Sequence, residues 1–164
     1  MMIQPKTAII ISTLVLVVLL RGLRRYFVLF WLAALPGILF HELSHWLLAF
    51  VSNGRPCFPR MLPKRVPGGY VLARVPVRNP TWYNGAFIGL APLLLIAMAF
   101  VAIVYGSPES WSWAQAWRIV LIPVFAAECL VECAPSTADW RIARKTLWPV
   151  AAAVVCVMVF RELW

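Results

Sequence analysis

The two histidines of this 164-residue chain lie four residues apart, and a glutamate directly follows the first. The run FHELSHW occupies positions 40–46, so the three side chains are His41, Glu42 and His45. On a helix, residues four apart lie on one face, so both imidazoles can reach one metal ion. The glutamate then lies beside the open coordination position, where its carboxylate can take a proton from bound water. The H-E-x-x-H spacing therefore predicts a zinc site able to hydrolyse a peptide bond, with Glu42 as general base.

The composition indicates that this motif lies in a membrane protein. Hydrophobic residues make up 63% of the chain, charged residues 13%, and the mean hydropathy is +0.83. A soluble domain carries about 25% charged residues, so an ordinary soluble protein and a disordered chain are both excluded. The net charge of +9 comes from cations placed between long apolar runs. This pattern favours the lipid bilayer as a partner and gives no support for nucleic acid.

Five segments are long and apolar enough to be candidate membrane spans, which need about 20 residues each. They cover approximately residues 7–20, 26–51, 85–105, 114–134 and 147–160. We therefore expect an all-α polytopic membrane protein, with residues 1–164 forming a single membrane-embedded domain. The Pro-rich polar loop 52–84 is not expected to span the membrane. Its segment Gly69 to Val77 follows a Pro-Gly-Gly turn signal and is expected to form an edge strand or a hairpin arm.

The distribution of Lys and Arg predicts the orientation in the membrane. With five spans, one side carries ten of them: Lys6, Arg55, Arg60, Lys64, Arg65, Arg74, Arg78, Arg141, Arg144 and Lys145. The other side carries at most five: Arg21, Arg24, Arg25, Arg118 and Arg161. The more positive side is expected to be cytoplasmic, with the amino terminus inside and the carboxyl terminus outside. The three arginines after the first span oppose this orientation.

A catalytic zinc site has three protein ligands and a water, so a third side chain is needed. The acidic residues outside the motif are Glu109, Glu128, Glu132, Asp139 and Glu162. Asp139 is the first candidate, because it follows the fourth span on the side where the second span carries His45. An ion pair with a nearby arginine is the other interpretation of Asp139. Glu128 and Glu132, four apart on an apolar helix, could supply the ligand, form a proton relay or stay neutral.

The four cysteines, Cys57, Cys129, Cys133 and Cys156, do not form a CxxC pair. Three of them lie in apolar stretches. Neither a disulfide framework nor a zinc site built on thiolates is expected. We interpret them as small apolar residues.

These features resemble the site-2 protease family of intramembrane zinc metalloproteases, in particular its short bacterial members. The H-E-x-x-H motif lies inside an apolar segment, and a polar loop with a Gly-Gly-containing strand follows it. The next span opens with the small-residue and proline pattern GAFIGLAP at positions 85–92. Asp139 follows Pro135 after a later span, although Ala134 and Trp140 stand where the family usually has Asn and Gly.

The resemblance implies that His41, His45 and Asp139 bind one zinc ion per chain and that Glu42 activates the attacking water. The substrate would be a transmembrane polypeptide, cleaved in or near its membrane segment. The location would be the bacterial cytoplasmic membrane, with the active site toward the cytoplasm. The 69–77 segment could hold an unwound stretch of substrate by β-addition. The small residues of 85–91 are expected to allow close helix packing.

Three other functions remain open. A membrane zinc peptidase of the HtpX-like or CAAX-processing type would use Glu128 or Glu132 in place of Asp139. A zinc-binding membrane protein without activity would have no need for Glu42 beside the metal. A transporter is the third, but the chain lacks two similar halves with broken helices.

Overall fold

The computed structural model describes residues 4–66 and 69–163, most of which are helical. The α-helices of the described residues are α1 (Pro5–Leu23), α2 (Phe27–Ala33), α3 (Leu35–Val51), α4 (Gly85–Gly89), α5 (Leu94–Gly106), α6 (Ala116–Glu132) and α7 (Thr137–Leu163). Short 3-10 turns, Ala91–Leu93 and Trp113–Gln115, precede α5 and α6. Two strands, β1 (Lys64–Val66) and β2 (Gly69–Val71), form a small antiparallel sheet. The expectation of a mostly helical chain with a small β-hairpin is confirmed.

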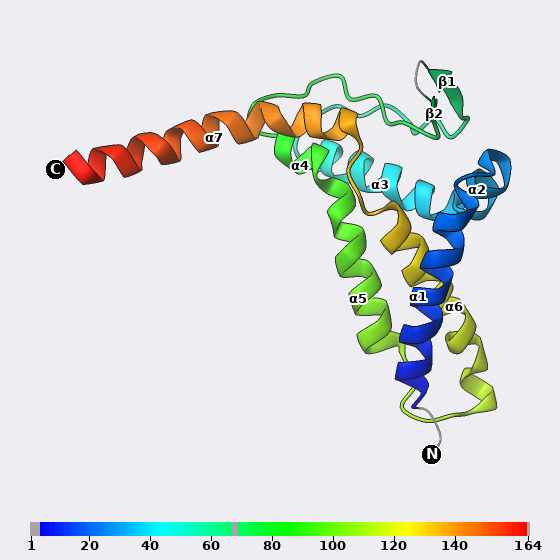
Figure 1. The fold of residues 1–164 in the computed structure, drawn as a ribbon. Helices are drawn as coiled ribbons and strands as arrows, with labels where there is room; N and C mark the ends of the chain where they lie inside the picture. The colour runs from blue at the N-terminus through cyan, green and yellow to red at the C-terminus, as the bar shows by residue number, and fades with distance from the viewer. Residues whose placement is uncertain (1–3, 67–68, 164) are drawn as a thin grey trace.

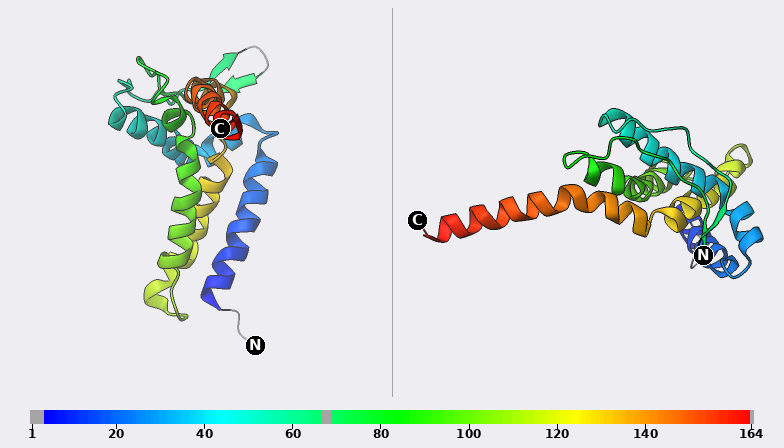
Figure 2. Two further views of the ribbon diagram at one scale, coloured as in Figure 1. Left: turned by 90° about the vertical axis from the view of Figure 1, so that its left-hand side faces the viewer. Right: turned by 90° about the horizontal axis from the view of Figure 1, so that it is seen from above.

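Three helices, α1, α5 and α6, stand side by side, while α3 and the start of α7 lie across one end of them (Figure 1). The rest of α7 extends away from the other elements (Figure 2). Its side chains between residues 150 and 160 are exposed in the isolated chain. Because these side chains are almost all apolar, they need lipid to cover them.

Within residues 4–66 and 69–163, three helices are long and apolar enough to cross a membrane: Pro5–Leu23, Trp113–Glu132 and Thr137–Arg161. A fourth candidate is the pair α2 and α3, which passes the same test as a unit but is bent by 66°. The chain thus has the character of a membrane protein, with three to four candidate spans where the sequence predicts five. The segment expected as the third span, 85–105, is divided, and α5 is a shorter apolar helix.

Proline explains both divisions. The expected 26–51 helix breaks at Ala34, just ahead of Pro36 in the first turn of α3. The expected 85–105 helix breaks at Leu90, just ahead of Pro92. Proline has no N–H to donate and disfavours helical backbone in the preceding residue, so a new helix starts at each position.

The polar loop folds into a long antiparallel ribbon, here defined as residues 54–66 and 69–79. The strands β1 and β2 form its tip, with Arg65 opposite Tyr70. Farther back, pairing continues only as isolated bridges, so the expected 69–77 strand is regular only over Gly69–Val71. Prolines on both arms explain the interruption, since each removes a ladder donor.

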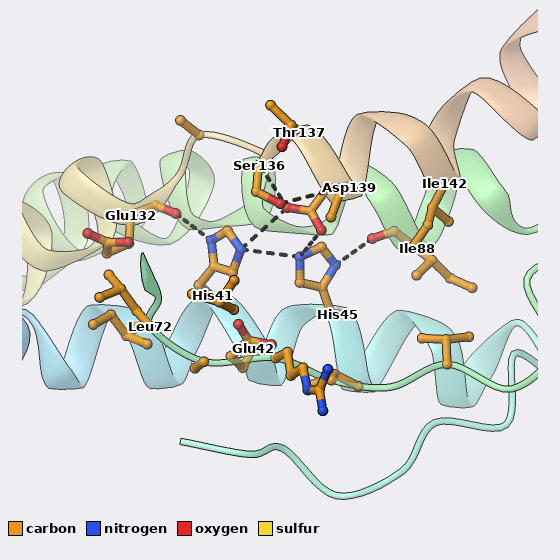
Figure 3. A pocket seen from close by; sticks show the side chains of 18 of the residues that line it. His41, Glu42, His45, Leu72, Ile88, Glu132, Ser136, Thr137, Asp139 and Ile142 are labelled. Atoms are coloured by element: carbon orange, nitrogen blue, oxygen red, sulfur yellow. Dashed lines mark hydrogen bonds and ion pairs between the residues drawn. The ribbon is translucent and has the colours of Figure 1, made fainter. Parts of the chain in front are cut away.

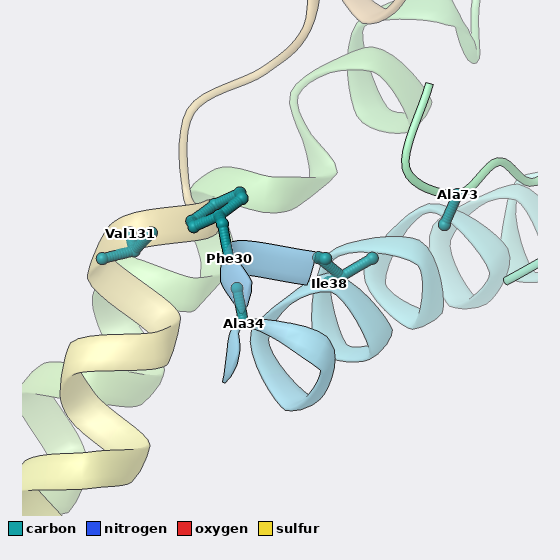
Figure 4. Close-up of a cluster of buried hydrophobic side chains, with 5 residues drawn as sticks. All are labelled: Phe30, Ala34, Ile38, Ala73 and Val131. Carbon is teal, nitrogen blue, oxygen red and sulfur yellow. The ribbon is translucent and has the colours of Figure 1, made fainter. Parts of the chain in front are cut away.

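Two buried clusters hold these layers together. Phe30 of α2, Ala34 at the break and Ile38 of α3 pack with Ala73 of the ribbon and Val131 of α6 (Figure 4). A second cluster joins α5 to α6 through Leu95, Ala99, Ala126 and Cys129. The first cluster fixes the ribbon over α3, the helix that carries both histidines. All four cysteines are free.

The turn between α1 and α2 lies at the same end of the molecule as the ribbon. The Arg24 guanidinium donates to the carbonyl oxygen of Val131 and lies 3.8 Å from the Glu132 carboxylate, at the end of α6. This differs from the expected topology, in which Arg21, Arg24 and Arg25 lie across the membrane from the loop. The chain is bent by 66° before α3, so residues 26–51 do not form the single straight helix on which the expected topology depends.

Candidate metal centre

Three side chains that can bind a metal converge between α3 and α7. His41 and His45 project from one face of α3, and Asp139 comes from the first turn of α7 (Figure 3). The Nε2 atom of His45 lies 3.2 Å from Asp139 Oδ1, and Nε2 of His41 lies 3.6 Å from Asp139 Oδ2. His45 and Asp139 are buried and His41 is partly buried. This cluster could hold a metal ion.

Main-chain carbonyl groups fix the orientation of both imidazoles. His41 Nδ1 lies 2.7 Å from the carbonyl oxygen of Glu132, and His45 Nδ1 lies 2.7 Å from that of Ile88. A carbonyl oxygen can only accept, so each Nδ1 carries the proton and donates it. In the neutral rings, each Nε2 is then left with a bare lone pair that points into the cluster.

The donor set fits a divalent cation. The two Nε2 atoms are 3.2 Å apart and face the same carboxylate. With both protons on Nδ1, no hydrogen lies between the two lone pairs, so a cation is the partner that stabilises the arrangement. Two ligands about 2.0–2.1 Å from a tetrahedral zinc ion would lie about 3.3 Å apart. Two imidazoles and a carboxylate therefore suit zinc in both type and spacing.

Asp139 is held by the start of its own helix. The Ser136 N–H donates to Asp139 Oδ2 at 2.6 Å, and the Asp139 N–H donates to Ser136 Oγ at 3.3 Å. This reciprocal pair is a capping box, which starts α7 at Thr137 and not near residue 147 as the sequence predicts. The Ser-x-x-Asp spacing at residues 136–139 is the signal in the sequence for this helix start.

A close approach of α4 to α7 positions both sides of the cluster. A Cβ atom at Gly89 would contact the carbonyl oxygen of Asp139 and lie 2.8 Å from Ala143. A Cβ at Gly85 would lie 2.6 Å from the carbonyl oxygen of Ile142. The small residues expected to pack helices therefore pack against the turn that carries the third metal-binding side chain. Ile88, beside Gly89, supplies the carbonyl that orients His45.

Glu42 is buried and lies next to the cluster without belonging to it. It lines a cavity of about 500 Å³ together with His41, His45 and Asp139. The ribbon forms another wall of this cavity, which Val75 lines together with Glu42. A carboxylate beside three metal-binding side chains is placed to move a proton at that site (Figure 3).

The two alternative carboxylates have other partners. Glu128 Oε2 accepts a hydrogen bond from the Gly37 N–H at 3.2 Å, in the first turn of α3. A Cβ at Gly37 would lie 2.7 Å from this oxygen, so glycine lets α3 approach α6 closely. The Glu132 carboxylate lies beside Arg24, while the main-chain carbonyl of Glu132 accepts the hydrogen bond from His41. Glu128 therefore caps the helix that carries the motif, and these contacts favour Asp139 as the third ligand.

No family model, no curated protein and no solved structure matches this chain. Its function has to be inferred from the chemistry of the site itself.

Proposed function

We propose that this protein is an intramembrane zinc endopeptidase of the site-2 protease type. The observation that carries the proposal is the convergence of His41, His45 and Asp139 on one point, with Glu42 beside it, among apolar helices. Ionisable side chains at membrane depth are costly, at least about 2.5–3.5 kcal/mol for a charged one, and are a default sign of function. A glutamate adjacent to the ligands favours catalysis over metal storage.

The side chains have distinct parts in the proposed reaction. A zinc ion held by the three ligands would supply Lewis acidity and lower the pKa of bound water to about 7. Glu42 takes a proton from the attacking water while the water oxygen bonds to the peptide carbonyl carbon. Glu42 then passes the proton to the nitrogen as the C–N bond breaks, and the second proton of the water moves from the new carboxyl group to the amine, which leaves a carboxylate and an ammonium group.

The ribbon gives the substrate a place to bind in extended form. Residues 70–75 line the cavity beside the histidines. A helical substrate has its carbonyls already hydrogen-bonded, so a stretch must unwind before one can reach the metal. Main-chain groups of the ribbon could pair with that stretch by β-addition.

The charge distribution supports a cytoplasmic location for the site. Twelve of the fifteen Lys and Arg residues belong to the end of α1 and the turn after it, to the ribbon, or to the first part of α7. They are Arg21, Arg24, Arg25, Arg55, Arg60, Lys64, Arg65, Arg74, Arg78, Arg141, Arg144 and Lys145. Figure 1 shows these segments at one end of the molecule. The positive-inside rule assigns this end to the cytoplasm. Because α1 ends near the ribbon, its amino terminus would lie on the side opposite to the cytoplasm. The charge count in the sequence predicts the amino terminus inside.

The test uses the purified protein reconstituted with a panel of single-span model helices that carry Gly, Asn or Pro within the span. We expect the zinc-loaded protein to cleave at least one of them, as detected by mass spectrometry, and a chelator to stop it. Glu42→Gln should keep one zinc ion per chain and lose cleavage. Glu128→Gln, which changes another buried carboxyl group in the same way, should keep both the zinc ion and the cleavage activity.

Cleavage that persists in Glu42→Gln would contradict the proposed general base. A native protein that binds zinc but shows no Glu42-dependent hydrolysis of any substrate would instead be a zinc-binding membrane protein without this activity.

A further inference from the structure

The ribbon carries an uncompensated positive charge. The loop 52–84 contains six cationic residues and no Asp or Glu. They are Arg55, Arg60, Lys64, Arg65, Arg74 and Arg78, and all six are exposed. Within residues 4–66 and 69–163, no ion pair joins any of them to a carboxylate. The protein itself therefore leaves this charge without a neutralising partner.

Two of these arginines are held directly opposite each other. Arg60 and Arg74 form an antiparallel bridge, with reciprocal backbone hydrogen bonds of 2.9 and 3.0 Å. Residues opposite each other in this way place their side chains on the same face, where like charges destabilise the pairing. An anionic group between the two guanidinium groups would relieve the repulsion and accept hydrogen bonds from both.

The pair borders a groove that leads to the metal centre. This groove, of about 680 Å³, is lined by Arg60, Lys64 and Arg74. It shares wall residues with the cavity around the histidines, namely Val66, Val71, Ala73, Arg74 and Ala138. Ala138 directly precedes Asp139, so the groove and the metal centre meet at the start of α7.

We propose that the groove beside Arg60 and Arg74 binds an acidic stretch of the polypeptide substrate, so that this pair selects substrates with Asp or Glu near the cleaved bond. The inference rests on the proposed function. A polypeptide is favoured over an anionic lipid because the groove opens into the cavity where hydrolysis would occur. A chain running from the groove to the metal passes Arg74, which lines both spaces.

The experiment measures peptide binding to Glu42→Gln protein in nanodiscs of phosphatidylcholine alone, so that neither cleavage nor anionic lipid interferes. The probe is a fluorescein-labelled soluble peptide of twelve residues with four Glu, compared with its four-Gln counterpart by anisotropy. We expect the Glu peptide to bind about tenfold more tightly. The double substitution Arg60→Gln with Arg74→Gln should abolish this preference.

The matched control is the double substitution Arg55→Gln with Arg78→Gln. These residues lie on the two arms of the same ribbon and are joined by one backbone hydrogen bond, from the Arg78 N–H to the Arg55 carbonyl oxygen at 3.3 Å. Neither is among the described residues that line the groove. This control removes the same charge and should keep the preference. An equal loss in both double variants would show an effect of net charge alone and overturn the proposal.

A second arm distinguishes a lipid site. Nanodiscs that contain phosphatidylglycerol are used to measure how much of this lipid stays with the purified protein. If the Arg60/Arg74 substitutions reduce retained phosphatidylglycerol and leave peptide preference intact, the pair is a lipid site and the proposal is wrong.

Failure of the inference can be separated from failure of the proposed function, because peptide binding requires no hydrolysis. A protease that cleaves model helices without any preference for Glu over Gln would overturn the inference alone. Peptide selection through Arg60 and Arg74 in a protein that hydrolyses nothing would overturn only the proposed reaction.

Discussion

The ring of Phe27 stacks on the ring of Tyr70, with the two centroids 4.0 Å apart and the planes at 24°. Phe27 is the first residue of α2, and Tyr70 lies in β2 at the tip of the ribbon. A straight helix over residues 26–51 would be about 39 Å long and would cross the roughly 30 Å hydrocarbon core. The stacked rings place the start of α2 beside the tip of the ribbon, and the pair α2 and α3 is bent by 66° and so is not a straight helix of this length.

This relationship predicts that Arg25 and Lys64 are accessible from the same side of the membrane. Each is replaced by cysteine in turn, in a protein whose four native cysteines have been changed to serine. A membrane-impermeant thiol reagent should label both positions from the cytoplasmic face. Labelling of the two positions from opposite faces would show that residues 26–51 cross the bilayer.

We predict that Gly89→Ala weakens metal binding. The added Cβ would contact the carbonyl oxygen of Asp139 and Ala143, pushing α7 away from the histidines. Changes behind a metal ligand typically reduce affinity about 10–100-fold, and we expect zinc affinity to fall within that range. Gly22→Ala in α1 is the matched control, because a Cβ there meets nothing within 4 Å. Equal zinc affinity in the two variants would show that the packing of α4 against α7 does not position Asp139.

The capping box makes Ser136 a positioning residue for Asp139. Ser136→Ala removes the hydroxyl that accepts the Asp139 N–H and should cost about 1 kcal/mol of stability. It should also loosen the metal site, seen as an altered visible spectrum of the cobalt-substituted protein, while Ser136→Thr restores the spectrum. Ser112→Ala, at a helix start where the side chain makes no capping bond, is the control. An unchanged spectrum in Ser136→Ala would show that the capping box does not position Asp139 for metal binding.

Zinc content also separates Asp139 from the two alternative ligands. Glu128→Gln keeps an oxygen that can accept the Gly37 N–H, and Glu132→Gln keeps the main-chain carbonyl that His41 needs. Both variants should therefore retain one zinc ion per chain. Loss of zinc in either, with the fold preserved by circular dichroism, would make that glutamate the third ligand and favour the HtpX-like alternative.

Much of the metal site could be predicted from local spacing. His41 and His45 share a face because four residues make about one helical turn, and this relationship needs no tertiary information. The sequence makes Asp139 the first candidate for the third ligand, because few carboxyl groups lie outside the motif, and the structure brings Asp139 to the histidines. The carbonyl groups that orient the imidazoles come from residues 43 and 91 positions away. No local pattern reports such contacts.

The path of the chain was harder to predict than its elements. Hydropathy identifies where apolar residues are dense, and every expected span does contain helix. Hydropathy does not predict the 66° bend between α2 and α3, which lies beside the proline at the second residue of α3. The orientation expected from counting charges consequently placed Arg24 across the membrane from the loop, although its guanidinium reaches Glu132 near the metal site.

The metal content of the detergent-purified protein, measured by elemental analysis for the native chain and for Asp139→Ala, tests the central claim most directly. We predict one zinc ion per native chain and its loss or marked loosening in the variant, with the helical content unchanged. A well-folded native protein that takes up no zinc even when zinc is supplied would contradict the account. The two histidines and Asp139 would then form a structural polar cluster.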